Sequence, residues 1–248
     1  MDTSSFDAMI DGKSRKFTAV ELPRLFLEWQ SEARMRLFKT MAQGGAGQAR
    51  VQPAHLPVLA TWSIDGMGGD FPVNLSTRGM GILPKQDMLA TFTAMLEKAR
   101  TENAGKPIQE TLPSRLKAME AFYGNVDNFD TRLLGGLEIF EGQTAKNMEA
   151  NPCVSLLYTG EAPKYPSFQF NAIVEKILPG NPHFQFLLAA RELFATDAFH
   201  LHQDAYPFGY LCKIVEIKDK TPFPHAASSP RGKPAGHVGG HPAWIPKK

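Results

Sequence analysis

The stretch from Gly135 to Tyr158, GGLEIFEGQTAKNMEANPCVSLLY, constrains the fold more than any other part of the chain. Apolar runs at Leu137 to Phe140 and at Cys153 to Tyr158 predict two strands. Between them, the polar segment from Ala145 to Ala150 has helical composition and predicts one short helix. The expected order is therefore strand, short helix, strand.

The start of this short helix carries groups that suit an anion. Thr144 is a candidate N-cap, and Asn151-Pro152 ends the helix because proline disfavours helical backbone in the residue before it. Thr144, Lys146 and Asn147 place a hydroxyl, an ammonium group and an amide beside the free backbone N–H groups of the first turn. A phosphate needs donors of this kind, so we expect an anion site here.

The run EIFEGQTAKNMEANPCVSLLY resembles a segment of the pyridoxamine 5′-phosphate oxidase-like FMN-binding split barrels. In that family, Ser/Thr-x-Lys precedes a short helix ending in NP and binds the FMN phosphate. The resemblance implies this role for Thr144 and Lys146, with Asn147 as their neighbour. It spans roughly Leu56 to Pro222 and includes stretches similar to later family elements, at Tyr165 to Lys176, Pro182 to Phe199 and Tyr210 to Lys218.

The predicted strands Pro57 to Ile64 and Phe71 to Met80, joined by a glycine-rich turn, look like the first hairpin of the same family. In that family, a basic residue on the returning strand joins the phosphate site. The resemblance implies Arg78, whose planar guanidinium can bind two phosphate oxygens, with Ser76 and Thr77 as neighbouring hydroxyl donors. The alternative is a surface arginine at a strand end.

A further candidate is Gln169, on the predicted strand Tyr165 to Lys176, where apolar and polar residues alternate. In the family, a Gln or Arg on this strand can reach the flavin. The competing interpretation of Gln169 is a solvent-facing strand residue.

The resemblance implies a mainly β fold with helices (α+β): an FMN-binding split β-barrel with an N-terminal helix and a helical insertion. We divide the chain into a polar lead and helix at 1–50, the barrel at 51–222 and a Pro/Gly/His-rich tail at 223–248. The helix is expected from Ala19 to Met41, and the lead before it, residues 1–17, as a loosely docked segment. The insertion, at about 84–130, contains two helical patterns, Gln86 to Arg100 and Ile108 to Tyr123, the second interrupted near Pro113.

Composition excludes several classes of protein. The formal net charge is +2 and no long basic run occurs, so nucleic acid is not an expected partner. No window reaches the roughly 18 apolar residues of a spanning helix, and the N-terminus has no signal-peptide pattern. The two cysteines, Cys153 and Cys212, lie in predicted strands, which favours no disulfide and a cytoplasmic location.

The common catalytic and metal motifs are also missing from the sequence. There is no G-x-G-x-x-G after a strand, no P-loop, no G-x-S-x-G and no H-E-x-x-H. The pairs His200/His202 and His237/His241 are weak metal candidates, and we predict no metal site from them. No residue is identifiable as a general acid or base, so the catalytic residues stay unknown.

The function that the resemblance implies is an FMN-dependent oxidoreductase acting on a small organic substrate. It also implies a homodimer with flavin bound between subunits. Two alternatives remain open. One is a haem- or flavin-binding protein without flavin turnover, a carrier or sensor, which the histidines of the tail favour because imidazole ligates iron. The other is a deazaflavin-dependent reductase.

Overall fold

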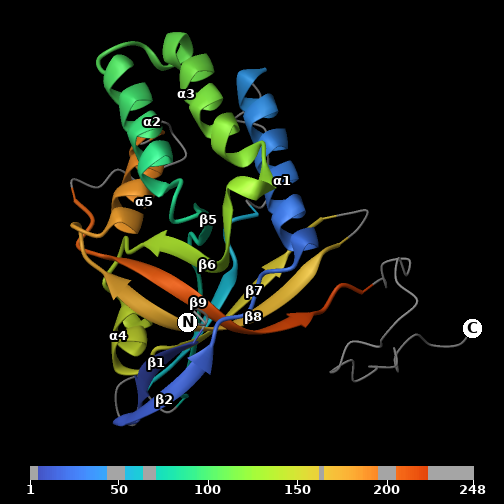
Figure 1. Cartoon of the computed structure of the whole chain (residues 1–248), viewed down its shortest axis with the longest axis vertical. Coiled ribbons are helices and arrows are strands. Elements are labelled where there is room, and N and C mark those ends of the chain that lie inside the picture. The colour runs from blue at the N-terminus through green and yellow to red at the C-terminus, as the bar shows by residue number, and fades with distance from the viewer. Residues whose placement is uncertain (1–4, 44–53, 64–70, 162–164, 195–204, 223–248) are drawn as a thin grey trace, which may run out of the picture.

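The computed structural model describes residues 5–43, 54–63, 71–161, 165–194 and 205–222 (Figure 1). Its centre is a seven-stranded antiparallel sheet with the strand order β4-β3-β7-β8-β9-β6-β5. A separate two-stranded sheet, β1-β2, lies at one end of the molecule, and four of the helices gather at the other end. The expected α+β class, mainly β with helices, is confirmed.

The bounds of the elements follow the chain. The strands are β1 (Ser5–Ile10), β2 (Lys13–Thr18), β3 (Val58–Trp62), β4 (Val73–Thr77), β5 (Gly81–Pro84), β6 (Phe129–Leu137), β7 (Cys153–Thr159), β8 (Ser167–Ile177) and β9 (Gly209–Asp219). The helices are α1 (Arg24–Ala42), α2 (Leu89–Glu102), α3 (Ile108–Tyr123), α4 (Gln143–Ala150) and α5 (Pro182–Glu192), with a 3-10 turn at Val126–Asn128.

The seven-stranded sheet is rolled into a barrel, as its connectivity requires. Strands β4 and β5 are the two outer strands in the order, yet only residues 78–80 separate them in the sequence. Four Cα steps of 3.8 Å span at most about 15 Å, so the two edges must lie close together. Arg78 N donates to Pro57 O at 3.2 Å and Met80 N to His55 O at 2.9 Å, so the linking segment still follows β3. The expected split-barrel architecture thus follows from the strand order.

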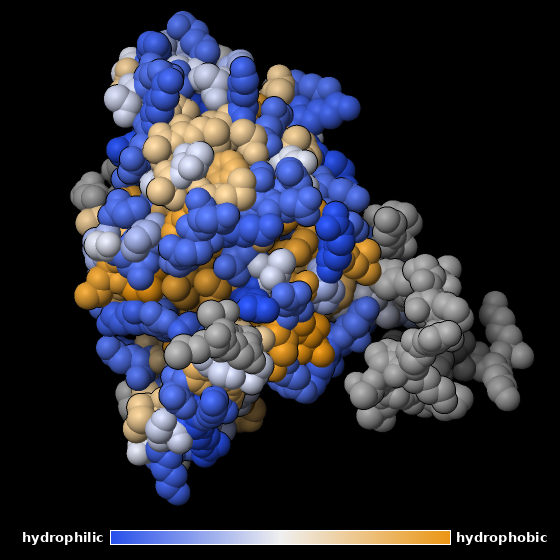
Figure 2. Space-filling view, in the orientation of Figure 1, coloured by the Kyte–Doolittle hydropathy of each residue, from blue (hydrophilic) through white to orange (hydrophobic). Residues whose placement is uncertain are grey.

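Aromatic side chains join the helices to the barrel. Phe26 of α1 is fully buried and meets Tyr158, Phe168 and Phe170 edge-on at ring centroid distances of 5.0, 5.6 and 4.7 Å. In the insertion, Phe122 of α3 meets the rings of Phe92, Phe129 and Phe186 in the same way. These rings form the core under the helices, so α1 and the inserted helices cover one end of the barrel (Figure 1). In the view of Figure 2, the strongest apolar colouring lies over the sheet at mid-height.

Four local expectations need correction. The strand expected at Leu137 to Phe140 lies earlier, since β6 is Phe129–Leu137 and the buried Glu138 follows it. Residues 5–18 form the hairpin β1-β2 and not a loose lead. Its turn, Asp11-Gly12, has φ values of 51° and 71°, the positive pair that a two-residue type I′ turn requires. Strand β5 was not expected, because it is only four residues long. Pro113 lies inside α3 without ending it, since the buried side of α3 packs against the core.

Several expectations lie outside the described residues. They concern the glycine-rich turn after Ile64, His200 and His202, and the tail with His237 and His241. Among the helices that the structure describes, none has the length and apolar character needed to cross a membrane.

Candidate functional site

Helix α4 begins two residues earlier than the sequence pattern predicts. Gly142 is the N-cap, with φ −89° and ψ −162°, and Lys146 N donates to Gly142 O at 3.2 Å as the first helical hydrogen bond. Thr144 is therefore the second residue of the helix and not its cap. Because glycine supplies no side-chain acceptor, no side chain caps this end of the helix. The predicted end is confirmed: Asn151 is the C-cap, and its side chain accepts from Cys153 N at 3.0 Å.

A continuous hydrogen-bonded network joins α4 to the β3-β4 hairpin. Thr144 Oγ1 accepts from Asn74 Nδ2 and donates to Ser76 Oγ, both at 2.9 Å. Asn147 Nδ2 donates to Thr61 Oγ1 at 3.1 Å, and Asn147 Oδ1 accepts from Gln143 Nε2 at 2.7 Å. Thr61, Thr144 and Asn147 are almost wholly buried, so these bonds satisfy polar groups that water does not reach.

The network leaves two groups free to meet a ligand. Ser76 Oγ accepts from Thr144, and no acceptor for its own hydrogen is found in the described part of the chain. Lys146 is exposed and forms no ion pair with another described residue. Ser76 and Lys146 therefore stay candidates for the predicted anion site at the N-terminus of α4.

Arg78 is on the same side of the hairpin but is paired. The strand register places Asn74 and Ser76 on the inner face, opposite Thr61 and Leu59, and Arg78 continues this alternation. Arg78 Nη1 lies 2.6 Å from Glu138 Oε1, with the two side chains 17% and 0% exposed. The charge of Arg78 is therefore matched by a buried carboxylate.

Glu138 was not expected from the sequence. Besides Arg78, its carboxylate accepts from Phe140 N at 2.8 Å and from Tyr210 OH at 3.2 Å. Burial, and then the Glu138 charge, raise the pKa of Tyr210 well above its usual value, so the phenol stays protonated as a donor. The signal in the sequence was an acidic residue inside an apolar strand run, a position that is rarely charged unless it is paired.

Thr77 and Gln169 lie on the opposite face of the sheet from this group. Thr77 pairs with Val58, and Gln169 pairs with Leu157, which itself pairs with Val58. Thr77 is exposed. Gln169 Nε2 donates to Ser155 Oγ and to Asn171 Oδ1, each at 3.1 Å. The structure thus joins Thr144, Ser76 and Asn147 in one network. It does not join Arg78, which pairs with Glu138, or the exposed Lys146 to that network, and Thr77 and Gln169 lie on the other face of the sheet.

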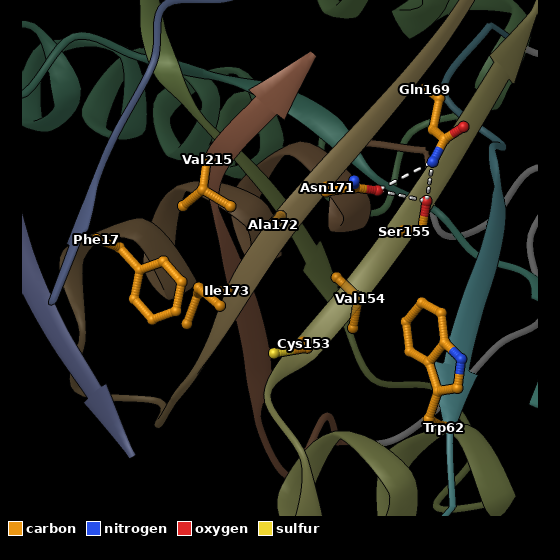
Figure 3. Close-up of a pocket in the computed structure, with 10 residues that line it drawn as sticks. All are labelled: Phe17, Trp62, Cys153, Val154, Ser155, Gln169, Asn171, Ala172, Ile173 and Val215. Atoms are coloured by element: carbon orange, nitrogen blue, oxygen red, sulfur yellow. Dashed lines mark hydrogen bonds between the residues drawn. The ribbon is translucent and has the colours of Figure 1, made fainter. Parts of the chain in front are cut away.

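Gln169 lines a hollow of about 370 Å³ on this outer face (Figure 3). Phe17 from β2 and Trp62 from β3 stand at its two sides, and side chains from β7, β8 and β9 lie between them. Most of the lining is apolar, and the polar groups gather where Gln169, Ser155 and Asn171 meet. Its volume falls in the usual range for small-molecule sites. Its lining residues are Phe17, Trp62, Cys153, Val154, Ser155, Gln169, Asn171, Ala172, Ile173 and Val215.

Neither cysteine is set up for reaction. Burial raises the pKa of Cys212 to about 12 and also raises that of Cys153, so both thiols are protonated at neutral pH. No group of three or more His, Cys, Asp or Glu side chains that could hold a metal ion occurs among the residues described above.

Comparisons with known proteins return matches only among solved structures. No family model matches the chain, and a search of curated proteins found no match. An FMN-binding protein from Syntrophomonas wolfei is similar over 80% of this chain and 93% of its own, with 8% identity and a TM-score of 0.39. A provisionally named pyridoxamine 5′-phosphate oxidase from Lactobacillus delbrueckii covers the same shares, with 14% identity and a TM-score of 0.35.

Haem proteins are found as well. HutZ, the haem storage protein of Vibrio cholerae, is similar over 68% of this chain and 87% of its own, with 11% identity and a TM-score of 0.37. At these values the likeness concerns the fold alone, and no ligand or activity of this chain is argued from it. The split-barrel architecture of this chain follows from its own strand order.

Proposed function

We propose that this chain is an FMN-dependent oxidoreductase for a small organic substrate, and that the start of α4 holds the flavin phosphate. The observation that carries the proposal is the 2.9 Å hydrogen bond from Thr144 Oγ1 to Ser76 Oγ. It fixes a hydroxyl of the β3-β4 hairpin at the start of α4, where Thr144 stands two residues before Lys146, whose side chain is exposed. A hydroxyl, an ammonium group and free amides are the donors that a phosphate dianion requires.

The residues of this group take different parts in the proposal. Ser76 and Lys146 donate to the phosphate, together with the first-turn amides. Thr144 and Asn147 position them, because the hydroxyl of Thr144 and the amide group of Asn147 are already used inside the network. Arg78 has one Nη on Glu138 and other N–H groups left, so it remains a candidate contact.

The flavin supplies the redox chemistry when it is bound, and the protein supplies binding and orientation. What this chain contributes is a rigid phosphate seat, since Thr61, Thr144 and Asn147 are buried and hydrogen-bonded between α4 and the hairpin. Thr77 and Gln169 would reach the same cofactor only from the outer face of the sheet. The proposal therefore covers the contacts to the FMN phosphate and does not assign the contacts to the flavin ring.

An absorption spectrum of the purified protein, followed by FMN titration of the colourless fraction, tests the proposal. We expect a flavin spectrum or stoichiometric uptake of FMN, and then reduction of the bound flavin by a small organic donor. A Soret band would instead indicate the haem-binding alternative. If the protein does not bind FMN but binds a deazaflavin, the cofactor is a deazaflavin and the proposed phosphate site is unchanged.

A further inference from the structure

The β1-β2 hairpin is a separate structural unit placed over the outer face of the barrel. Within the part of the chain that the structure describes, its two-stranded sheet shares no ladder with the seven-stranded sheet (Figure 1). The pairing of Phe6 with Phe17 and of Ala8 with Arg15 puts these four residues on one face of the hairpin. Phe17 is part of the lining of the hollow, so this face is turned toward the barrel (Figure 3).

In the described ranges, β1 and β2 contact the barrel through side chains and not through backbone hydrogen bonds. The rings of Phe6 and Phe17 stack with centroids 5.9 Å apart, and Lys213 of β9 places its ammonium group 4.9 Å from the Phe6 ring. The next backbone bond to the barrel is at the base of the hairpin, where Val20 N donates to Ile214 O at 2.8 Å. Among the described residues, the backbone of this unit is therefore bonded to the barrel only at its base.

The hollow beside it has a volume and a mixed apolar and polar lining that suit a small molecule. Its two aromatic walls come from different units, Phe17 from the hairpin and Trp62 from the barrel. A bulge in the β8-β9 pairing, between Asn171 and Ala172, leaves Val215 without a partner and turns it into the lining. At the polar end, Gln169, Ser155 and Asn171 are bonded to one another and hold fixed positions.

We propose that this hollow binds a flat aromatic molecule and that the β1-β2 hairpin is its lid, with Phe17 as the closing contact. Flat rings suit the site because aromatic faces are available from both Phe17 and Trp62, and aliphatic side chains form the surface between them. The amide and hydroxyl groups of Gln169, Ser155 and Asn171 would hydrogen-bond to polar atoms at one edge of the ring.

Two molecules share this chemistry: the ring system of a flavin and a separate aromatic substrate. The first choice rests on the proposed function, whereas the second does not require it. Gln169 and the network at the start of α4 lie on opposite faces of the sheet. A flavin whose ring lies in the hollow would compete with another aromatic molecule for it, whereas a flavin bound elsewhere would not.

The test titrates the full chain with lumiflavin, which is the flavin ring without phosphate, and with 2-naphthol, a flat aromatic that is not a flavin. We expect Phe17→Ala to weaken binding of a ring that enters the hollow by roughly 5- to 10-fold, the loss of one good aromatic contact, mainly through faster dissociation. The matched control is Lys16→Ala, the neighbouring residue on the outer face of the same strand, which should bind as the wild type does.

Hydrogen exchange gives an independent readout of the lid. A bound ring should slow exchange of the amides of residues 5–18, because it holds the hairpin down. If FMN displaces 2-naphthol, the hollow is the seat of the flavin ring; if both bind at once, it is the seat of a separate aromatic substrate. Either result supports the site.

Two results would overturn it: neither ring binds, or both bind equally to wild type and Phe17→Ala without protecting the hairpin. In the second case, FMN binding that still depends on Lys146 would leave the proposed function standing. Conversely, the protein could bind 2-naphthol in a way that depends on Phe17 and fail to bind FMN. That result would contradict the proposed function and support the aromatic site.

Discussion

At the scale of single residues, Lys146 is the charge on which the proposed phosphate site depends. It is exposed and unpaired among the described residues, whereas Arg78 is paired with Glu138. We expect Lys146→Ala to weaken FMN binding by roughly 1.5–3 kcal/mol, the range for a charged hydrogen bond. Isothermal titration of apo-protein with FMN measures the change.

The control for this prediction is Lys117→Ala, which removes the same charge from the exposed side of α3, away from α4. It should leave the FMN affinity at the wild-type value. Equal affinities for wild type and Lys146→Ala would show that Lys146 does not contact the phosphate.

His183 makes the stability of the fold depend on pH. Burial lowers its pKa below the ordinary 6.5, against the raising effect of Asp130 and Glu175, and its Nε2 has no hydrogen-bond partner among the described residues. The unfolded chain therefore binds this proton more readily. The contribution of His183 to stability is fully present above about pH 6.5 and is lost as pH falls below that value. The slope from one such group is at most about 1.4 kcal/mol per pH unit.

Urea unfolding of wild type and His183→Gln at pH 7.5 and pH 5.0 measures this effect. The wild type should lose more free energy of unfolding between the two pH values than the variant does. The same loss in both proteins would mean that other groups cause the acid sensitivity.

Residue identity alone predicted the short helix that carries the candidate residues Thr144, Lys146 and Asn147. It was predictable because helix starts near a glycine turn and Asn-Pro stops have short-range signals. The role of these residues in binding stays a prediction. The partners Thr61 and Asn74, and the pair of Arg78 with Glu138, were not predictable in the same way. They depend on which strand faces α4, and that is decided by long-range pairing.

At the scale of elements, the β3-β4, β7-β8 and β9 strands followed from their alternation, since each has one apolar face. The β1-β2 hairpin did not, because β2 (KSRKFT) is exposed at nearly every position and has no apolar period to detect. Its turn signal, Asp11-Gly12, was present in the sequence. Turn chemistry was thus a better guide than hydropathy for a hairpin that packs through only a few side chains.

The contact of β6 with the segment linking β4 to β5 closes the barrel and requires a glycine. A Cβ at Gly136 would lie 2.3 Å from Gly79 O and 2.9 Å from Met80 Sδ, closer than real Cβ contacts. Because the first neighbour is backbone, it cannot rotate away. We expect Gly136→Ala to lower the free energy of unfolding by about 1–3 kcal/mol, the usual cost of overpacking.

Gly79→Ala is the matched control from the other side of the same contact, since a Cβ there would meet nothing within 4 Å. Denaturant unfolding of the two variants should show a loss for Gly136→Ala only. Equal stabilities would mean that the two segments can separate without cost, and that the barrel is closed elsewhere.

At the scale of the whole molecule, the helices and the outer sheet face have different roles. Helices α1, α2, α3 and α5 cover one end of the barrel, and α4 lies at the other end (Figure 1). The outer face of β4, β3 and β7 is left with exposed apolar side chains, Leu75 at 64% and Leu157 at 36% exposure. Through their common neighbour β3, these leucines lie on one face.

This face is where we place the contact of the proposed homodimer. An exposed apolar face on an otherwise closed barrel is best covered by another protein surface, and a two-fold axis lets one patch meet its copy. Leu75→Asp would put a carboxylate into that contact without removing anything from the core. Sedimentation velocity should therefore show a dimer for the wild type and a monomer for Leu75→Asp.

Leu178→Asp is the control, because Leu178 is 61% exposed between β8 and α5, away from this face, and this variant should stay dimeric. A Leu75→Asp variant that still dimerises would move the contact to another face. A monomeric wild type would mean that any flavin has to be held by one subunit alone.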